Sequence, residues 1–297
     1  MLNNVIPVRS SHRADTRMPV YYLSHGGGPW PFMEGPFRAM FAQLERSLQD
    51  IPRQLPAEPR ALLVITGHWE AAQFTVSTGP QPGMIYDYFG FPESMYQIHY
   101  PAPGSPELAA QVAALLEKSG WHVGTDPQRG FDHGTYSLLK PLYPEANIPV
   151  VQLSLRTPLD PAEHISVGRA LAPLRDQGVL ILGSGQSFHN MHIRGTQARH
   201  ASETFDAWLR HSVLAEPDAR AAALMEWEYA PNARIAHPHA DHLIPLHVAA
   251  GAAEDDLASC VFGDYIADLA TSAYRFDGRF RESAFDALRL HERHLHR

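Results

Sequence analysis

Short, unbroken runs of apolar residues alternate along this chain with longer segments in which apolar residues recur at helical spacing. The unbroken runs predict strands at 19–23, 61–66, 74–77, 121–124, 148–155 and 178–182. The helical spacing predicts helices at 36–48, 106–119, 161–174, 203–214, 218–228, about 241–251 and 285–294. Two late strands, expected to be antiparallel, are predicted at 261–262 and 274–276.

Strands that alternate with helices at this spacing are typical of an α/β fold. We therefore predict a single domain with a mostly parallel or mixed central sheet and helices on both of its faces. Residues 19–297 contain no internal repeat and no low-complexity linker, so they are assigned to one domain. Residues 1–18 are polar and patternless, and we expect them to form a loose N-terminal extension.

Composition and charge narrow the classes of binding partner and the cellular location to be expected. The formal net charge is -8, and no block of Lys and Arg could follow a phosphate backbone, so a nucleic-acid partner is not expected. No apolar run approaches the roughly 18 residues that a membrane-spanning helix needs. The N-terminus lacks the apolar centre of a secretory signal, so we expect a cytoplasmic location.

Histidine is the residue type that carries the candidate chemistry. The 18 histidines stand beside a single cysteine, so a metal here would be held by nitrogen and oxygen ligands. Five of them lie at or near the ends of predicted elements: His25, His68, His133, His189 and His242. Ligands bind at the carboxyl ends of strands in open α/β sheets, and imidazole is the commonest metal ligand and general base. The pattern therefore predicts a metal-dependent enzyme.

Each motif also has a simpler interpretation. The segment 24–29 (SHGGGP) fits a tight turn with a surface histidine as well as it fits a ligand site, and no P-loop lysine follows it. His237 and His239 are expected on an exposed approach loop, and His291, His294 and His296 on a solvated terminal helix. HExxH and GxSxG motifs are absent from the sequence.

Seven motifs occur in an order that matches one known family. They are SHGGGP, GHWE, YDYFGFPESMYQIHYPAPGSP, GFDHG, VVQLSL, SGQSFHN and DHLIPL. On these motifs the chain resembles the DOPA 4,5-dioxygenase extradiol-type family, a branch of the class III extradiol superfamily that includes the protocatechuate 4,5-dioxygenase β-subunit. The resemblance spans about residues 19–276.

The resemblance implies that residues 19–297 form a catalytic domain that opens a catechol ring beside its two hydroxyls. Both atoms of O₂ would enter a muconic semialdehyde-type product. His25, His68 and His242 match the metal ligands of the family. His189 matches its acid–base residue, which counts as a fourth ligand in some relatives, and His133 matches a contact to substrate or oxygen. One divalent metal is implied per chain, with Fe²⁺ required for activity and Zn²⁺ fitting the same site.

The aromatic segment that begins at Tyr86 is expected to supply a wall for a planar substrate. Tyr86, Tyr88 and Phe89 are the side chains assigned to it. Two other functions remain open from the sequence. A zinc hydrolase of the same architecture would turn over an ester or amide without oxygen. A binding protein would keep the metal site without the chemistry.

Overall fold

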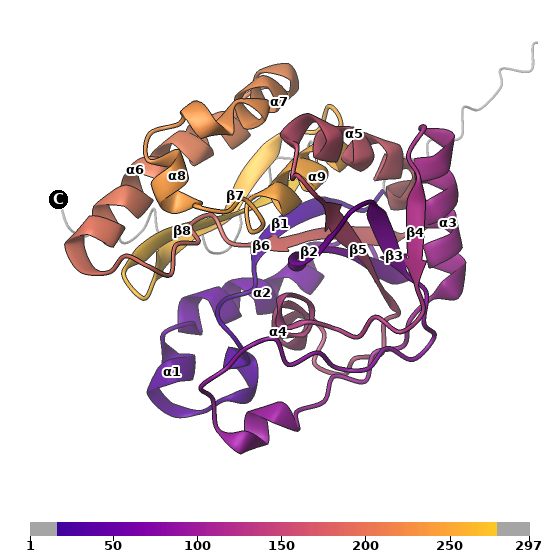
Figure 1. The fold of residues 1–297 in the computed structure, drawn as a ribbon, viewed down its shortest axis with the longest axis horizontal. Helices are drawn as coiled ribbons and strands as arrows, with labels where there is room; N and C mark the ends of the chain where they lie inside the picture. The colour runs from indigo at the N-terminus through magenta and orange to yellow at the C-terminus, as the bar shows by residue number, and fades with distance from the viewer. Residues whose placement is uncertain (1–16, 278–297) are drawn as a thin grey trace, which may run out of the picture.

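The computed structural model describes residues 17–277, and within them eight strands form one sheet in the order β4-β3-β5-β2-β6-β1-β8-β7 (Figure 1). The strands are β1 (Val20–Ser24), β2 (Ala61–Ala71), β3 (Phe74–Ser77), β4 (Val123–Asp126), β5 (Val150–Arg156), β6 (Val179–Gly185), β7 (Ala258–Ile266) and β8 (Leu269–Phe276). Strands β5, β2, β6 and β1 run parallel at the centre. The hairpin β7–β8 pairs with β1 in the antiparallel direction, so the predicted mixed sheet is confirmed.

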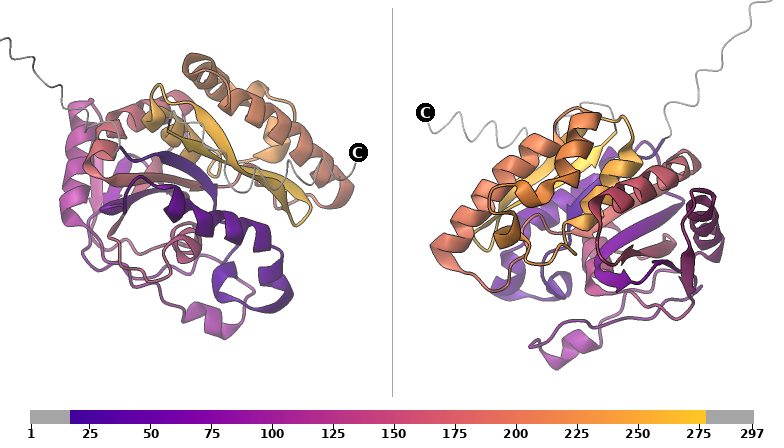
Figure 2. Two further views of the ribbon diagram at one scale, coloured as in Figure 1. Left: turned by 180° about the vertical axis from the view of Figure 1, so that it is seen from behind. Right: turned by 45° about the horizontal axis from the view of Figure 1, so that its top comes forward.

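Helices cover both faces of this sheet (Figures 1 and 2). One face carries α3 (Pro106–Lys118), α5 (Pro161–Leu171), α6 (Gly195–Val213) and α9 (Ile244–Ala253). The other face carries α2 (Ala42–Gln54) and α4 (His133–Leu142). Strand β2 carries apolar side chains on both of its faces, so both faces of the sheet have to be buried by helices. Leu63 and Ile65 pack into the first layer, while Leu62 and Val64 pack into the second.

Shorter elements connect these layers. The remaining α-helices are α1 (Gly35–Ala39), α7 (Pro217–Met225) and α8 (Ala233–Ala236). Short 3₁₀ helices occupy Trp30–Phe32, Glu93–Tyr96, Ala172–Gln177 and Trp227–Tyr229. The predicted helix 285–294, with His291, His294 and His296, lies outside the described residues, as do residues 1–16 of the predicted extension. Among residues 17–277, none of the helices is both long enough and apolar enough to cross a membrane.

The structure divides one predicted helix in two and contains one helix that was not predicted. The single helix expected at 36–48 is broken into α1 and α2, because the chain turns at Phe41 and buries that ring against Trp30 at a centroid distance of 5.0 Å. Helix α4 was not predicted. Its ten residues include Gly134 and Pro141, two residue types of low helix propensity, so nothing in the local sequence indicated a helix there. Burial of nearly the whole helix stabilises it in the fold.

A buried histidine ties α5 to the end of β5. The backbone N–H of Arg156 donates to Nε2 of His164 at 3.1 Å, and Nδ1 of His164 lies 2.7 Å from the carbonyl oxygen of Asp160. Nε2 must therefore be unprotonated, and burial lowers the pKa of His164 to about 4. Protonation of this ring would break the contact with Arg156.

We expect this histidine to make the protein less stable in acid. In the unfolded chain His164 takes up a proton near pH 6.5, whereas in the folded chain it does so only near pH 4. Stability is therefore fully present above about pH 6.5 and falls as the pH drops from there to 4, by about 3 kcal/mol from this group. Urea unfolding of the wild type and of His164→Gln between pH 6.5 and pH 4 measures this loss of stability. The variant should show the shallower pH dependence, and parallel curves would contradict the assignment.

Candidate active site

The first predicted site residue follows β1 directly. His25 is buried, and its backbone carbonyl accepts a hydrogen bond from Nε1 of Trp30 at 2.7 Å. The next residue, Gly26, has φ +74°, and a Cβ there would lie 2.4 Å from Nε1 of Trp30. Glycine is needed at this turn because both the backbone conformation and the close indole exclude a side chain. The glycine-rich turn therefore fixes the backbone of His25.

His68 lies within β2, not after it. The strand was expected to end at residue 66, but it continues to Ala71. Its pairing with β5 shifts register between Ile65 and Glu70. An irregularity of this kind bends a strand and re-aims its side chains, here in the segment that contains His68.

His133 is the first residue of α4. The preceding Asp132 caps the helix, because its carboxylate accepts from the backbone N–H of Thr135 at 3.0 Å and from Oγ1 of Thr66 at 2.9 Å. Thr66 belongs to β2, two residues before His68. This cap therefore places the start of α4, and with it His133, beside the strand that carries His68.

His189 and His242 both lie in loops, outside the helices and strands. His189 follows β6, and its backbone N–H donates to the carbonyl of Ala236 at 3.0 Å. His242 was expected in the first turn of a helix starting at Asp241, but α9 begins at Ile244, and His242 lies in the turn before it. That turn is held by the carbonyl of His242, which accepts from the hydroxyl of Tyr22 at 2.8 Å.

The predicted exposure of His237 was wrong. Its ring is fully buried beside Phe205 and Trp227, with Nε2 at 3.0 Å from the carbonyl oxygen of Ser187. The dense run of polar residues around it concealed that its loop folds inward. His239 is exposed as expected and lies 2.6 Å from the carboxylate of Glu70.

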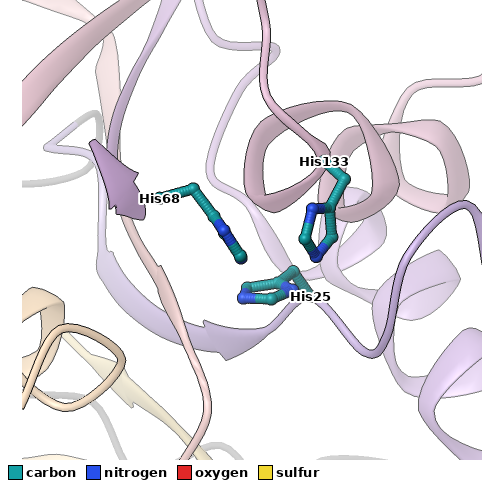
Figure 3. A group of neighbouring side chains, drawn as sticks. All are labelled: His25, His68 and His133. Atoms are coloured by element: carbon teal, nitrogen blue, oxygen red, sulfur yellow. The ribbon is translucent and has the colours of Figure 1, made fainter. Parts of the chain in front are cut away.

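The five predicted histidines meet in one cluster. The side chains of His25, His68 and His133 point toward one another (Figure 3), and they offer nitrogen atoms within 4.8 Å of one another. The ring of His242 lies 4.7 Å from that of His68 and 5.2 Å from that of His25 between centroids. His189 stacks on His242 at 3.5 Å. Elements that are far apart in the chain therefore deliver five imidazoles to one place.

The electrostatics of this cluster suit a metal ion. Burial, reinforced by the neighbouring histidines, lowers the pKa of His25 and His242 well below the usual range. Burial and His133 lower the pKa of His68 to about 3. These rings are neutral at neutral pH, so each keeps a lone pair for coordination. Among the described residues, neither ring nitrogen of the buried His25 has a hydrogen-bond partner, and a bound cation would supply a partner for the one that carries the lone pair.

Two carboxylates near the cluster were missed by the sequence analysis. Asp87 places Oδ1 2.8 Å from Nδ1 of His133 and Oδ2 3.2 Å from Nδ1 of His68. Asp241 places Oδ2 3.0 Å from Nδ1 of His242 and Oδ1 3.9 Å from Nδ1 of His189. Each lies in a motif already singled out, Asp87 between Tyr86 and Tyr88 and Asp241 next to His242. Carboxylates adjacent to site residues are a usable signal, because ligating histidines commonly donate their second N–H to one.

The aromatic segment approaches the cluster only in part. The ring of Tyr88 lies 5.9 Å from that of His133 and 6.4 Å from that of Tyr86. The hydroxyl of Tyr86 donates to the carbonyl of Ile98 at 2.8 Å, which anchors the loop. Phe89 is 93% exposed, so the structure does not pack it against the other two.

Comparison with known proteins identifies the family. The sequence model of one protein family, described as the catalytic LigB subunit of aromatic ring-opening dioxygenase, matches residues 19–281 of this chain. The chain belongs to this family. It is 44% identical over 205 residues to the 4,5-DOPA dioxygenase extradiol of Beta vulgaris, which covers 67% of this chain and 75% of that protein. The 4,5-DOPA dioxygenase extradiol of Escherichia coli (strain K12) is 32% identical over 250 residues, covering 80% of this chain and 86% of that protein.

A solved structure agrees with this assignment. The crystal structure of an uncharacterized Escherichia coli K12 protein superposes with a TM-score of 0.70 at 27% sequence identity, covering 87% of this chain and 99% of that chain. The predicted enzyme class, an extradiol ring-cleavage dioxygenase, is thereby confirmed. The family also implies a non-haem metal, for which the histidine cluster is the candidate site.

Proposed function

We propose that this enzyme cleaves a DOPA-like catechol beside its two hydroxyls at an Fe²⁺ ion held by His25, His68 and His242, with His189 adjacent to the same ion. The observation that carries the proposal is the buried ring of His25. Both of its nitrogens lack a partner among the described residues, although they lie in a cluster of neutral imidazoles. The substrate class is proposed from the names of the relatives.

A bound ferrous ion supplies a Lewis acid for the catechol oxygens and a redox partner for O₂, and Zn²⁺, which the same nitrogens fit, supplies only the first. The chain's own residues then handle protons. Burial lowers the pKa of His189 although Asp241 opposes the effect, so His189 is neutral and can accept the proton of a catechol hydroxyl. The same ring can return that proton to oxygen as the aromatic ring opens.

His133 and the aromatic segment are proposed to position the substrate. Nδ1 of His133 faces Asp87, which leaves Nε2 on the side of the cluster, where it can accept a hydrogen bond from a catechol hydroxyl (Figure 3). Tyr88 lies edge-on to this ring and offers a face for the planar substrate, with Tyr86 behind it. Phe89 would join this wall only if its exposed side chain turned inward. The extent of the catalytic domain, 19–297, and the cytoplasmic location stay predictions.

Oxygen uptake tests this function directly. Apoprotein loaded with Fe²⁺ under anaerobic conditions should consume one O₂ per catechol and form a yellow ring-opened product with at least one of DOPA, caffeate, protocatechuate and catechol. Labelled ¹⁸O₂ should place both oxygen atoms in the product. Protein loaded with Zn²⁺ is the matched control and should be inactive. Hydrolysis of an ester or amide by the zinc form, with no oxygen uptake by the iron form, would favour the hydrolase instead.

A further inference from the structure

Asp87 connects three separate elements at the histidine cluster. It lies in the loop between β3 and α3, and its carboxylate reaches His68 on β2 and His133 at the start of α4. Oδ1 also accepts from the backbone N–H of His133 at 3.0 Å. Oδ1 therefore contacts both the backbone N–H and Nδ1 of His133, and Oδ2 faces Nδ1 of His68.

We propose that Asp87 is a positioning residue that selects the Nδ1–H tautomer of His68 and His133 together and so keeps both Nε2 atoms unprotonated. The proposal rests on the proposed function in one respect, because His68 acts there as a metal ligand. The tautomers themselves are properties of the metal-free chain.

The carboxylate of Asp87 determines which nitrogen of each ring carries the proton. An ionised carboxylate only accepts hydrogen bonds, so a ring nitrogen that faces it at close range must carry its proton there. Nδ1 of His133 lies 2.8 Å from Oδ1, and Nδ1 of His68 lies 3.2 Å from Oδ2. A lone pair at either place would be repelled by the oxygen. A neutral imidazole has one N–H, so Nε2 of each ring is left with its lone pair.

On the far side of the His68 ring from Asp87, Nε2 lies close to a second histidine. Nε2 of His68 lies 3.2 Å from Nε2 of His242, at hydrogen-bond distance. Nδ1 of His242 has no hydrogen-bond partner among the described residues, so His242 can carry its proton on Nε2 and donate it to His68. The lone pair that Asp87 leaves on Nε2 of His68 therefore points into a gap where a cation can replace that proton.

The contacts of Asp87 predict an unequal result when its charge is removed. In Asp87→Asn, the amide oxygen must face the backbone N–H of His133, because two donors cannot face each other. The amide NH₂ then points to Nδ1 of His68. That nitrogen has to accept, so its proton moves to Nε2 and the ligand lone pair is lost. His133, which faces the oxygen, keeps its Nδ1–H tautomer.

Zinc affinity and histidine NMR test the proposal on the full chain. The matched control is Asp160→Asn, where the carboxylate caps α5 by accepting from the N–H of Glu163 at 2.9 Å and asparagine can cap equally well. Competition with a chromophoric chelator should show ~10–100-fold weaker zinc binding for Asp87→Asn and wild-type binding for the control. The ¹⁵N spectra of the apoproteins should show His68 as Nδ1–H in the wild type and Nε2–H in Asp87→Asn, with His133 unchanged.

The outcomes separate this proposal from the proposed function. If wild-type protein binds no zinc, the proposed metal site fails, while the apoprotein spectra still decide the role of Asp87. Unchanged zinc affinity and an unchanged His68 tautomer in Asp87→Asn would overturn the proposal. An Nε2–H tautomer of His68 in wild-type apoprotein would overturn it too, even if the variant did not fold.

Discussion

Replacing His189 by glutamine is expected to lower kcat for ring cleavage by ~10²–10⁴-fold, the usual share of general acid–base catalysis. The side chain of His189 is 27% exposed, more than that of His68 at 17% or His133 at 9%, so it can reach a substrate proton. Glutamine preserves the size and the hydrogen bonding of this side chain. It cannot take up a proton near neutral pH, so the loss should appear in kcat with the fold intact.

Iron content decides which role His189 has. If His189 is only an acid–base group and not a metal ligand, the His189→Gln variant should keep one iron per chain and bind catechol normally. Loss of iron together with activity would instead make His189 a ligand. His122→Gln is the matched control, because His122 is exposed and lies just before the edge strand β4, outside the cluster. A His189→Gln enzyme at full rate would refute the acid–base assignment.

Replacing Gly185 by alanine is expected to destabilise the fold by about 1–3 kcal/mol or more and to displace His242. A Cβ at the end of β6 would lie 2.0 Å from the carbonyl oxygen of His242. That oxygen accepts from Tyr22 and from the backbone N–H of Gln186 at 3.1 Å, so it cannot move without breaking these bonds. The backbone around His242 must shift, and we expect zinc binding to weaken with it. Urea unfolding and zinc titration measure the two effects.

Gly83→Ala is the matched control for this change. Among the described residues no atom lies within 4 Å of a Cβ built at Gly83, and its φ is not in the left-handed region. The control should unfold and bind zinc like the wild type. If Gly185→Ala did the same, β6 would not be holding the turn that carries His242.

The local pattern was sufficient for the framework of this fold. Unbroken apolar runs predicted the central strands, because a strand buried on both faces needs apolar residues at every position. The predicted helix at 106–119 begins as serine before an apolar helical run leads one to expect, since the side chain of Ser105 accepts from the N–H of Leu108 at 3.2 Å. Helix α4 could not be found in this way, because Gly134 and Pro141 within it disfavour a helix locally and burial in the fold stabilises it.

The sequence by itself determined the family and the set of five histidines, since both depend on residue types and on their order along the chain. Only the tertiary structure decided what each imidazole faces. His68 meets His242 across 174 positions, and Asp87 meets His133 across 46. The sheet order sets these meetings, and it follows from the packing of whole layers. Periodicity describes a residue's near neighbours, so it predicted where the rings stand but neither the carboxylates behind them nor the burial of His237.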